Sequence, residues 1–390
     1  MNYKGTIRAC FVGYIVQAIV VNFAPLLFVT FQTQYGIPLS QVTMLITVTF
    51  GLQLTIDFLS AYFIDKIGYR AAAIIAHACS AIGLVLLAIL PEILPNAFVG
   101  LLCAVFFYAI GGGLLEVLIS PIVEACPTEN KAQSMSILHS FYAWGSAAVI
   151  VISTLFLKIF GTEKWRLLAV LWAILPVVNG IVFLKTPIAP LIAEGETGLK
   201  PHSLFKIKVF WILAILMVCA GASEQAVSQW ASTFAEKGLG ISKVMGDLAG
   251  PTIFALLMGA SRSIYGRLLH KFTLRTMMLF SGLLCVVSYL IIGLIPNSVI
   301  GLLGVVMCGF SVGILWPGTF SIAAAEIKNG GTAMFALYAL AGDLGCMSGP
   351  TLAGLVATAA GENLRIGIMS SIIFPVLMIA GLLMLKKEKA

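Results

Sequence analysis

Long apolar stretches and short polar segments alternate along the whole chain. A transmembrane α-helix needs about 20 predominantly apolar residues, and charges or clusters of proline, glycine and asparagine mark where such a stretch ends. The pattern predicts twelve membrane-spanning helices, at residues 7–33, 39–64, 70–90, 97–125, 132–158, 166–185, 208–234, 246–269, 274–295, 298–326, 331–358 and 364–385.

Composition agrees with a chain surrounded by lipid. Apolar residue types make up 60% of the sequence and charged types 10%, whereas soluble proteins carry about 25% charged residues. The mean hydropathy is +1.05. We therefore expect an all-α, multi-pass protein of the cell membrane (an inner or plasma membrane), in contact with membrane lipid.

The predicted helices fall into two groups of six, separated by a longer polar stretch. We expect an N-terminal six-helix bundle at residues 1–185, a cytoplasmic linker at 186–207 and a C-terminal bundle at 208–390. If both termini are cytoplasmic, the loops and tails on that side hold sixteen Lys and Arg residues and the opposite side holds six. Since cytoplasmic loops are enriched in Lys and Arg, this orientation is the one predicted.

The two groups show signs of an internal repeat. The segment "AYFIDKIGYR" (61–70) aligns with "GRLLHKFTLR" (266–275), so that Lys66 meets Lys271 and Arg70 meets Arg275. Each segment joins the second and third helix of its group. A duplicated six-helix unit of this kind places its substrate site near the membrane midplane, between the two halves.

One carboxylate stands out inside the predicted spans. In "GGGLLEVLISPIVEA" (111–125), Glu116 lies ten residues before Cys126, about 15 Å along a helix and therefore deep in the membrane. An ionisable residue at that depth is a hypothesis of function by default. The three preceding glycines allow a neighbouring helix to come close, and Pro121 interrupts the helix hydrogen bonds. A group that binds and releases a proton fits this pattern, and a protonated Glu that only packs is the alternative.

Other polar and aromatic side chains inside the spans are candidates for lining a substrate site. His139 and Tyr142 are three residues apart and share a helix face. Amides, carboxylates and aromatic rings together suit a sugar, whose hydroxyls take hydrogen bonds and whose C–H face stacks on a ring. Structural packing is the alternative for each of them. The candidates are Gln17, Asn22, Glu116, His139, Tyr142, Glu224, Gln225, Gln229, Trp230, Trp316 and Asp343.

Charged residues near the cytoplasmic ends of the spans have a simpler explanation. We expect them to form ion pairs that close a cytoplasmic gate and break when it opens. These gate candidates are Asp57, Asp65, Arg70, Glu124, Arg262 and Glu326.

Several motifs of enzymes and cofactor proteins are missing from the sequence. The eight cysteines form no CxxC pair, which argues against a metal site or a disulfide framework. The sequence has no phosphate-binding GxxxxGK[ST] loop and no HExxH or GxSxG motif. We therefore expect neither an enzyme nor a bound cofactor or metal, and no nucleic-acid partner.

The arrangement of six plus six helices with a repeated basic loop resembles the major facilitator superfamily. Residues 61–70 match part of that family's loop pattern, with Asp65, Lys66, Gly68 and Arg70 in place. The segment "GCMSGPTLAG" (345–354) is similar to the family's glycine–proline packing motif. Within the superfamily, "GGGLLEVLISPIV" (111–123) resembles the fourth helix of fucose:proton symporters. Further similar segments are "LHSFYAWGSA" (138–147), "LWPGTFSI" (315–322) and "FQTQYG" (31–36).

This resemblance implies a role for Glu116, because the glutamate at its position in those symporters takes part in proton coupling and sugar binding. Those symporters also carry a functional aspartate in the first helix. Here that position falls near Pro25, and the helix offers Gln17 and Asn22 instead. Either Glu116 works alone, or another acid such as Glu224 or Asp343 takes the second part, or transport is uncoupled.

The sequence as a whole predicts a secondary transporter. We expect a monomer that takes up a small neutral sugar or polyol together with a proton, by alternating access, with Glu116 as the proton-coupling group. The alternatives are an exporter of drugs or amphipathic metabolites, a sodium-coupled or uncoupled sugar transporter, and a sensor that binds a ligand without moving it.

Overall fold

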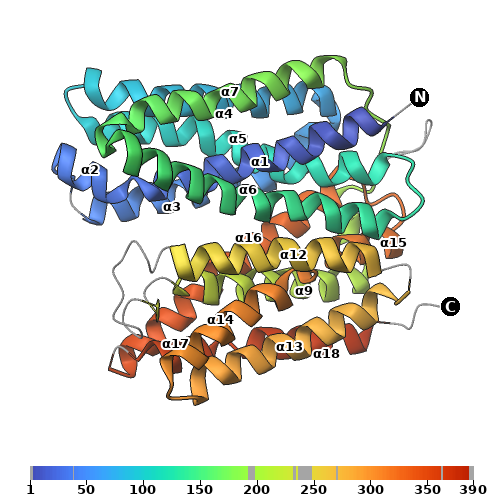
Figure 1. Cartoon of the computed structure of the whole chain (residues 1–390). Helices are drawn as coiled ribbons and strands as arrows, with labels where there is room; N and C mark the ends of the chain where they lie inside the picture. Colours follow the sequence, from blue (N-terminus) through green and yellow to red (C-terminus); the bar gives the residue numbers. More distant parts are fainter. Residues whose placement is uncertain are drawn as a thin grey trace. The chain divides into compact units, whose positions relative to one another are not determined.

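The structure is a computed structural model that describes residues 3–37, 39–191, 198–231, 234–235, 248–268, 271–361 and 363–385. These residues form helices and connecting segments, with no strand among them. The α-helices are drawn in Figure 1 and are α1 (Lys4–Leu26), α2 (Phe28–Tyr35), α3 (Leu39–Ile67), α4 (Tyr69–Ile93), α5 (Ala97–Ala125), α6 (Lys131–Phe160), α7 (Trp165–Lys185), α8 (Pro201–Leu204), α9 (Lys208–Ser228), α12 (Ile253–Leu268), α13 (Leu274–Leu294), α14 (Ser298–Val312), α15 (Leu315–Glu326), α16 (Gly331–Ala359), α17 (Leu364–Ser370) and α18 (Ile373–Met384). A 3₁₀ turn, η1 (Thr162–Lys164), precedes α7, and a π-helical turn, η2 (Leu248–Thr252), precedes α12.

Each of the twelve predicted stretches contains helix. Three of them are helix pairs with a short break: α1 with α2, α14 with α15, and α17 with α18. Parts of two predicted spans (232–233, 246–247 and 269) and of the predicted linker (192–197) lie outside the described residues. The all-α prediction is confirmed.

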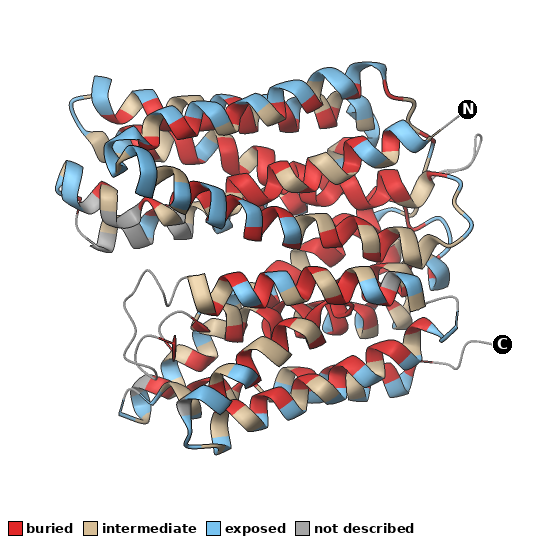
Figure 2. Ribbon diagram, in the orientation of Figure 1, coloured by how far each residue is buried: buried red, intermediate tan, exposed pale blue. Residues whose placement is uncertain are grey.

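Among the residues that the structure describes, nine helices are long and apolar enough to cross a bilayer. Helix α7 shows why such a helix suits lipid. Its large exposed side chains are apolar and recur at helical spacing, among them Leu167, Leu171, Ile174, Val178 and Ile181. Figure 2 shows the exposed positions of the helices in pale blue. A helix face of this kind is costly in water and stable in hydrocarbon.

The described chain divides into two compact units. Unit 1 comprises Met1–Pro127, Trp144–Thr197 and Gly331–Ala336, and unit 2 comprises Thr128–Ala143, Gly198–Gly330 and Leu337–Ala390. Helix α6 therefore gives its first half to unit 2 and its second half to unit 1. The first six residues of α16 belong to unit 1 and the rest to unit 2.

Unit 1 is built around α5, which packs on α4, α3 and α1. The three glycines of α5 explain how three neighbours approach one helix, because successive helical residues point about 100° apart. A Cβ at Gly111 would lie 2.7 Å from the carbonyl oxygen of Ala76 on α4. A Cβ at Gly112 would lie 3.1 Å from Val20 on α1, and one at Gly113 would lie 3.3 Å from Ile56 on α3. Each glycine thus serves a different neighbouring helix.

Unit 2 uses small residues in the same way. Helix α14 packs on α12 and α13, and α9 packs on α15 and α18. Glycines of the "GCMSGPTLAG" segment bring α16 onto α9: a Cβ at Gly345 would lie 2.9 Å from the backbone nitrogen of Ala222, and one at Gly349 would lie 2.5 Å from its carbonyl oxygen. The packing role expected for this segment is therefore visible in the structure.

At equivalent positions of the repeat, each unit has an arginine that bonds the carbonyls at the end of a helix. In unit 1, Arg70 donates to the carbonyls of Phe183 and Leu184 at the end of α7, at 2.9 and 2.6 Å. In unit 2, Arg275 donates to the carbonyls of Leu382 and Leu383 at the end of α18, at 3.0 and 3.2 Å. A cation at a helix C-terminus bonds carbonyls that have no partner within the helix and meets the negative end of the helix dipole.

Candidate functional site

Glu116 is buried on α5 and is held by two amides from two other helices. Its side-chain oxygen Oε2 accepts a hydrogen bond of 2.9 Å from Nε2 of Gln17 on α1. The same oxygen accepts a second hydrogen bond from Nε2 of Gln53 on α3. Glu116 is 9% exposed and Gln17 and Gln53 are each 4% exposed. Three helices of unit 1 therefore converge on one carboxylate.

Gln53 is a part of this site that sequence reasoning missed. An uncharged amide in a helix rich in Thr and Leu carries no signal of its own. Two features of the structure explain the contact between Gln53 and Glu116. Gly113 lets α3 come close to α5, because a Cβ at Gly113 would lie only 3.4 Å from the Cα of Gln53. Gln53 also lies one turn before Asp57, which is buried, so both residues are on the buried face of α3.

Further polar groups lie along α1. The hydroxyl of Tyr14 is 2.8 Å from Oγ of Ser120 on α5. Asn22 donates to the carbonyl of Ala18 at 2.8 Å and to Oγ of Ser146 on α6 at 3.2 Å. Ser120 is one turn from Glu116, so that α1 and α5 meet through polar side chains at two levels.

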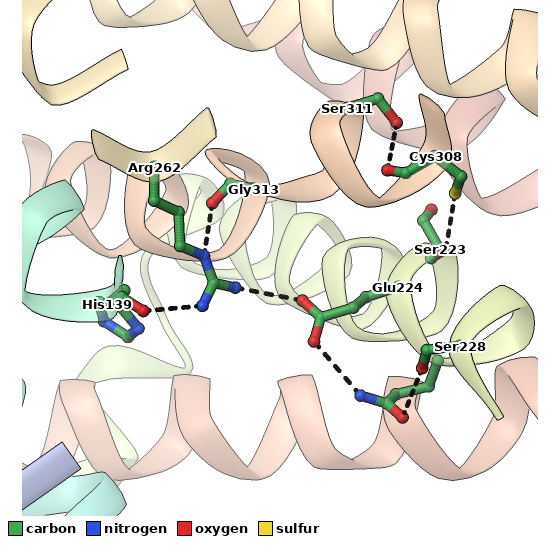
Figure 3. A network of polar contacts seen from close by, with 9 residues as sticks. His139, Ser223, Glu224, Ser228, Arg262, Cys308, Ser311 and Gly313 are labelled. Carbon is green, nitrogen blue, oxygen red and sulfur yellow. Dashed lines mark hydrogen bonds and ion pairs between the residues drawn. The ribbon is translucent and has the colours of Figure 1, made fainter. Parts of the chain in front are cut away.

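Unit 2 contains a second cluster of polar groups, centred on Arg262 of α12 (Figure 3). Its Nη2 lies 3.2 Å from Oε2 of Glu224 on α9, and the two side chains form an ion pair. Its Nη1 donates to the carbonyl of His139 on α6 at 2.9 Å, and its Nε donates to the carbonyl of Gly313 at 2.9 Å. Arg262 is 3% exposed. We call these four residues the Arg262 network.

Further polar side chains of α9, among them the lining candidates Gln225 and Gln229, extend from this network. Nε2 of Gln225 donates to Oε1 of Glu224 at 3.3 Å. Oε1 of Gln225 in turn accepts hydrogen bonds from Oγ of Ser228 at 3.1 Å and from Nε2 of Gln229 at 3.0 Å. Gln229 is exposed and Glu224 is buried, so this chain of amides runs from the protein interior to its surface.

Aromatic residues of unit 2 form a row beside the network. The His139 ring stacks on Phe320 of α15, with ring centres 6.0 Å apart and planes 29° apart. Trp316 packs edge-on against Phe320, with ring centres 6.2 Å apart and planes 70° apart. A Cβ at Gly342 on α16 would collide with the Trp316 ring, so only glycine leaves room for it. Phe320 was not predicted, because one phenylalanine among twenty-four carries no signal.

Three further lining candidates, Trp230, Asp343 and Tyr142, belong to unit 2. Nε1 of Trp230 donates to the carbonyl of Pro350 at 3.1 Å, which ties it to α16. Asp343 is buried on α16, and Tyr142 is half-buried on α6. Their roles in substrate binding stay predictions.

The gate candidates are distributed over both units. Thr332 donates to Oδ1 of Asp65 at 2.5 Å and accepts a hydrogen bond from the hydroxyl of Tyr69. Arg70 bonds the end of α7 and Arg262 pairs with Glu224, as described above.

The other three gate candidates differ in burial. Asp57 is buried on α3, Glu124 is half-buried at the end of α5, and Glu326 is exposed at the end of α15. Their function as a gate stays a prediction.

A polar cluster at the far end of α4 was not predicted. Glu92 forms an ion pair of 3.1 Å with Arg166 on α7 and accepts a hydrogen bond of 2.7 Å from the hydroxyl of Tyr35 on α2. Burial, together with the neighbouring Glu92 carboxylate, raises the pKa of Tyr35 well above its usual range. Tyr35 therefore remains a hydrogen-bond donor at physiological pH and holds α2 to α4.

The family of the chain follows from a comparison of its sequence with known families. The profile of the Major Facilitator Superfamily matches residues 10–350. The chain belongs to this superfamily of membrane transporters, and it is not an enzyme. A comparison with curated protein sequences gives no match.

Solved structures of transporters share the fold. The Escherichia coli fucose:proton symporter FucP superposes with a TM-score of 0.83 at 15% identity, over 98% of this chain and 98% of that chain. The proton:xylose symporter XylE gives a TM-score of 0.82 at 13% identity, over 97% and 94%. The human organic anion transporter MFSD10 gives 0.77 at 17% identity, over 98% and 100%. At such identities the likeness establishes the fold.

Proposed function

We propose that this transporter takes up a small neutral sugar or polyol together with a proton, by alternating access, and that Glu116 is the proton-coupling group. The observation that carries the proposal is the pair of neutral amides on the Glu116 carboxylate. A symporter's proton group must be stable both with and without its proton.

The two amides suit both states of Glu116. An ionised carboxylate accepts N–H bonds, as Oε2 does from Gln17 and Gln53. A protonated carboxyl donates one O–H bond, and a glutamine can accept it after its amide group turns over. Glu224 differs, because its carboxylate is paired with the permanently charged Arg262. Glu116 is therefore the better proton-coupling candidate of the two.

The groups gathered in unit 2 support the substrate class. The His139 ring stacks on Phe320 and Trp316 packs edge-on against the same phenylalanine ring, and the amides of Gln225 and Gln229 offer donors and acceptors. Rings for C–H faces and amides for hydroxyls are the groups with which proteins bind sugars. FucP and XylE, which share the fold, are proton symporters of the sugars fucose and xylose, in agreement with this class.

The proposal includes two pseudo-symmetric halves, at residues 1–185 and 208–390, joined by a cytoplasmic linker at 186–207. The equivalent bonds of Arg70 and Arg275 to the last helix of their halves support this duplication. We further propose that the protein works as a monomer in the cell membrane, with both termini in the cytoplasm and the named acidic and basic residues closing a cytoplasmic gate.

Uptake into proteoliposomes tests the proposed function. Vesicles with an imposed pH gradient, an imposed sodium gradient or no gradient are compared for uptake of radiolabelled hexoses, pentoses and polyols. We expect the pH gradient, acidic outside, to accumulate at least one of these solutes above its equilibrium level. Accumulation that follows only the sodium gradient would refute proton coupling, and equilibration without accumulation would indicate an uncoupled transporter.

Export of organic molecules is the competing function. MFSD10, which shares the fold, is an organic anion transporter, and in this chain the buried cation Arg262 is the residue that would favour an anionic solute. Ethidium and anionic dyes in the same vesicles distinguish the two. Proton-driven dye transport without sugar uptake would favour the exporter.

A further inference from the structure

Arg262 makes hydrogen bonds to three separate parts of unit 2 with one side chain. Nη2 bonds the carboxylate of Glu224 on α9, Nη1 bonds the carbonyl of His139 on α6, and Nε bonds the carbonyl of Gly313 between α14 and α15. Figure 3 shows the guanidinium at the centre of these partners. A guanidinium presents five N–H donors in a fixed plane, whereas a lysine ammonium is a compact point charge that cannot span three partners in this way.

Pro317 explains why the carbonyl of Gly313 accepts a side-chain donor. In a regular helix this carbonyl would bond the N–H of residue 317, four positions later. Proline has no N–H, so that bond is missing. Nε of Arg262 donates to the carbonyl instead, at 2.9 Å. The bend between α14 and α15 is thereby held directly before Trp316, one of the proposed substrate-binding rings.

Two hydrogen bonds join Arg262 and α6, one donated by each. Nη1 of Arg262 donates to the carbonyl of His139, and the carbonyl of Arg262 accepts a hydrogen bond of 2.6 Å from Oγ of Ser136, one turn earlier on α6. Both partners lie in the segment Thr128–Ala143, which belongs to unit 2, whereas the rest of α6 belongs to unit 1. The bonds of Arg262 thus fall on the part of α6 that is grouped with unit 2.

We propose that Arg262 is a positioning residue for substrate binding in unit 2. It holds the backbone at His139, the carboxylate of Glu224 and the bend before Trp316 in one arrangement, so that the proposed lining groups on α6, α9 and α15 keep their relative places. That these groups line a substrate site rests on the proposed function. The arrangement that Arg262 holds can be measured without any substrate.

Hydrogen–deuterium exchange of the purified full-length protein tests the arrangement. In Arg262→Lys and Arg262→Gln, we expect faster exchange in peptides covering residues 131–143 and 310–318. Peptides covering 144–160 of the same helix should exchange as in the wild type. Arg275→Lys, which changes an arginine that bonds the end of α18, serves as the matched control and should leave all these peptides unchanged. Equal acceleration along the whole of α6, or none, would overturn the proposal.

Uptake kinetics test the link to substrate. We expect Arg262→Lys to raise the substrate concentration for half-maximal uptake by about tenfold, because one or two hydrogen bonds that position the lining groups are lost. Its maximal proton-driven rate should fall much less. A fall in maximal rate at unchanged half-saturation would overturn a positioning role.

A paired variant covers the case in which Arg262→Gln does not fold. Arg262→Gln with Glu224→Gln removes both charges and leaves no unpaired buried ion. We expect this double variant to fold, to show the same local acceleration at 131–143 and 310–318, and to retain the high half-saturation concentration. Wild-type exchange in the double variant would overturn the proposal. If no sugar is transported by any variant, including the wild type, the proposed function fails while the exchange result still decides the role of Arg262.

Discussion

The amide of Gln53 on α3 donates a hydrogen bond to Glu116 on α5, and Gln17 on α1 donates to the same carboxylate oxygen. A buried carboxylate that shares its hydrogen bonds with two neutral amides is stabilised without a permanent positive partner in either bond. This relationship separates Glu116 from Glu224, whose carboxylate meets a guanidinium.

Replacing Gln53 tests whether that bond matters for transport. We expect Gln53→Leu to lower proton-driven uptake about tenfold or more, since a hydrogen bond to a charged group contributes about 1.5–3 kcal/mol. Uptake by reconstituted vesicles measures this. Gln133→Leu on α6 removes an amide elsewhere and should stay near wild-type rates. Equal rates for both variants would mean that Gln53 takes no part.

Replacing the glycines of α5 tests the packing that brings the three helices together. In Gly111→Ala, the new methyl group would meet backbone atoms of α4, which cannot move aside as a flexible side chain can. We expect a loss of about 1–3 kcal/mol of stability from overpacking, seen as a lower Tm in detergent. Gly51→Ala on α3 is the control, because no atom of the described residues beyond its own stretch of helix lies within 4 Å of its Cβ position. A Tm equal to that of the wild type in Gly111→Ala would contradict the close approach.

Replacing Arg70 and Arg275 tests whether equivalent positions of the two halves play the same part. We expect Arg70→Gln and Arg275→Gln each to reduce stability by about 1 kcal/mol, because each loses its bonds to a helix end. Thermal unfolding of the single and double variants should show additive losses, since the two sites lie in different units. If Arg70→Gln changes uptake but not Tm, the gate role predicted from the sequence would be favoured over the role at the end of α7.

Replacing Pro317 tests whether this proline is the origin of the bend before Trp316. In Pro317→Ala, the new N–H can bond the carbonyl of Gly313 and compete with Arg262. We expect weaker substrate binding with equal or higher Tm. Pro375→Ala on α18 changes a buried proline of the same unit and should leave substrate affinity unchanged. Unaltered affinity in Pro317→Ala would show that the bend does not set the place of Trp316.

The sequence predicted the fold well, because the length and apolarity of each span are local properties. Glu116 was equally visible, since one charge in an apolar run is a strong signal. Gln53 was not, because an amide among threonines and leucines looks like any polar packing residue until the glycines of α5 bring α3 close. Its contact with Glu116 is a tertiary relationship across 63 positions of sequence.

Arg262 shows a different limit of prediction from sequence. It lies near the end of its predicted span, five residues before Arg267, and for that reason it was one of the gate candidates. The structure pairs it with Glu224, 38 positions away in sequence. The repeat register that aligns Lys66 with Lys271 also aligns Asp57 with Arg262, so equivalent positions of the two halves carry opposite charges. Sequence spacing alone does not reveal which helix such a side chain meets.

The most direct test of the central claim is Glu116→Gln measured in two ways in the same proteoliposomes. A glutamine resembles the protonated glutamate in shape but cannot release a proton. We expect uptake driven by a pH gradient to be lost, while exchange of internal for external substrate without a gradient continues. Glu92→Gln, outside the Glu116 site, should retain both activities. If Glu116→Gln still accumulates substrate against its gradient in response to the pH difference, Glu116 is not the proton-coupling group.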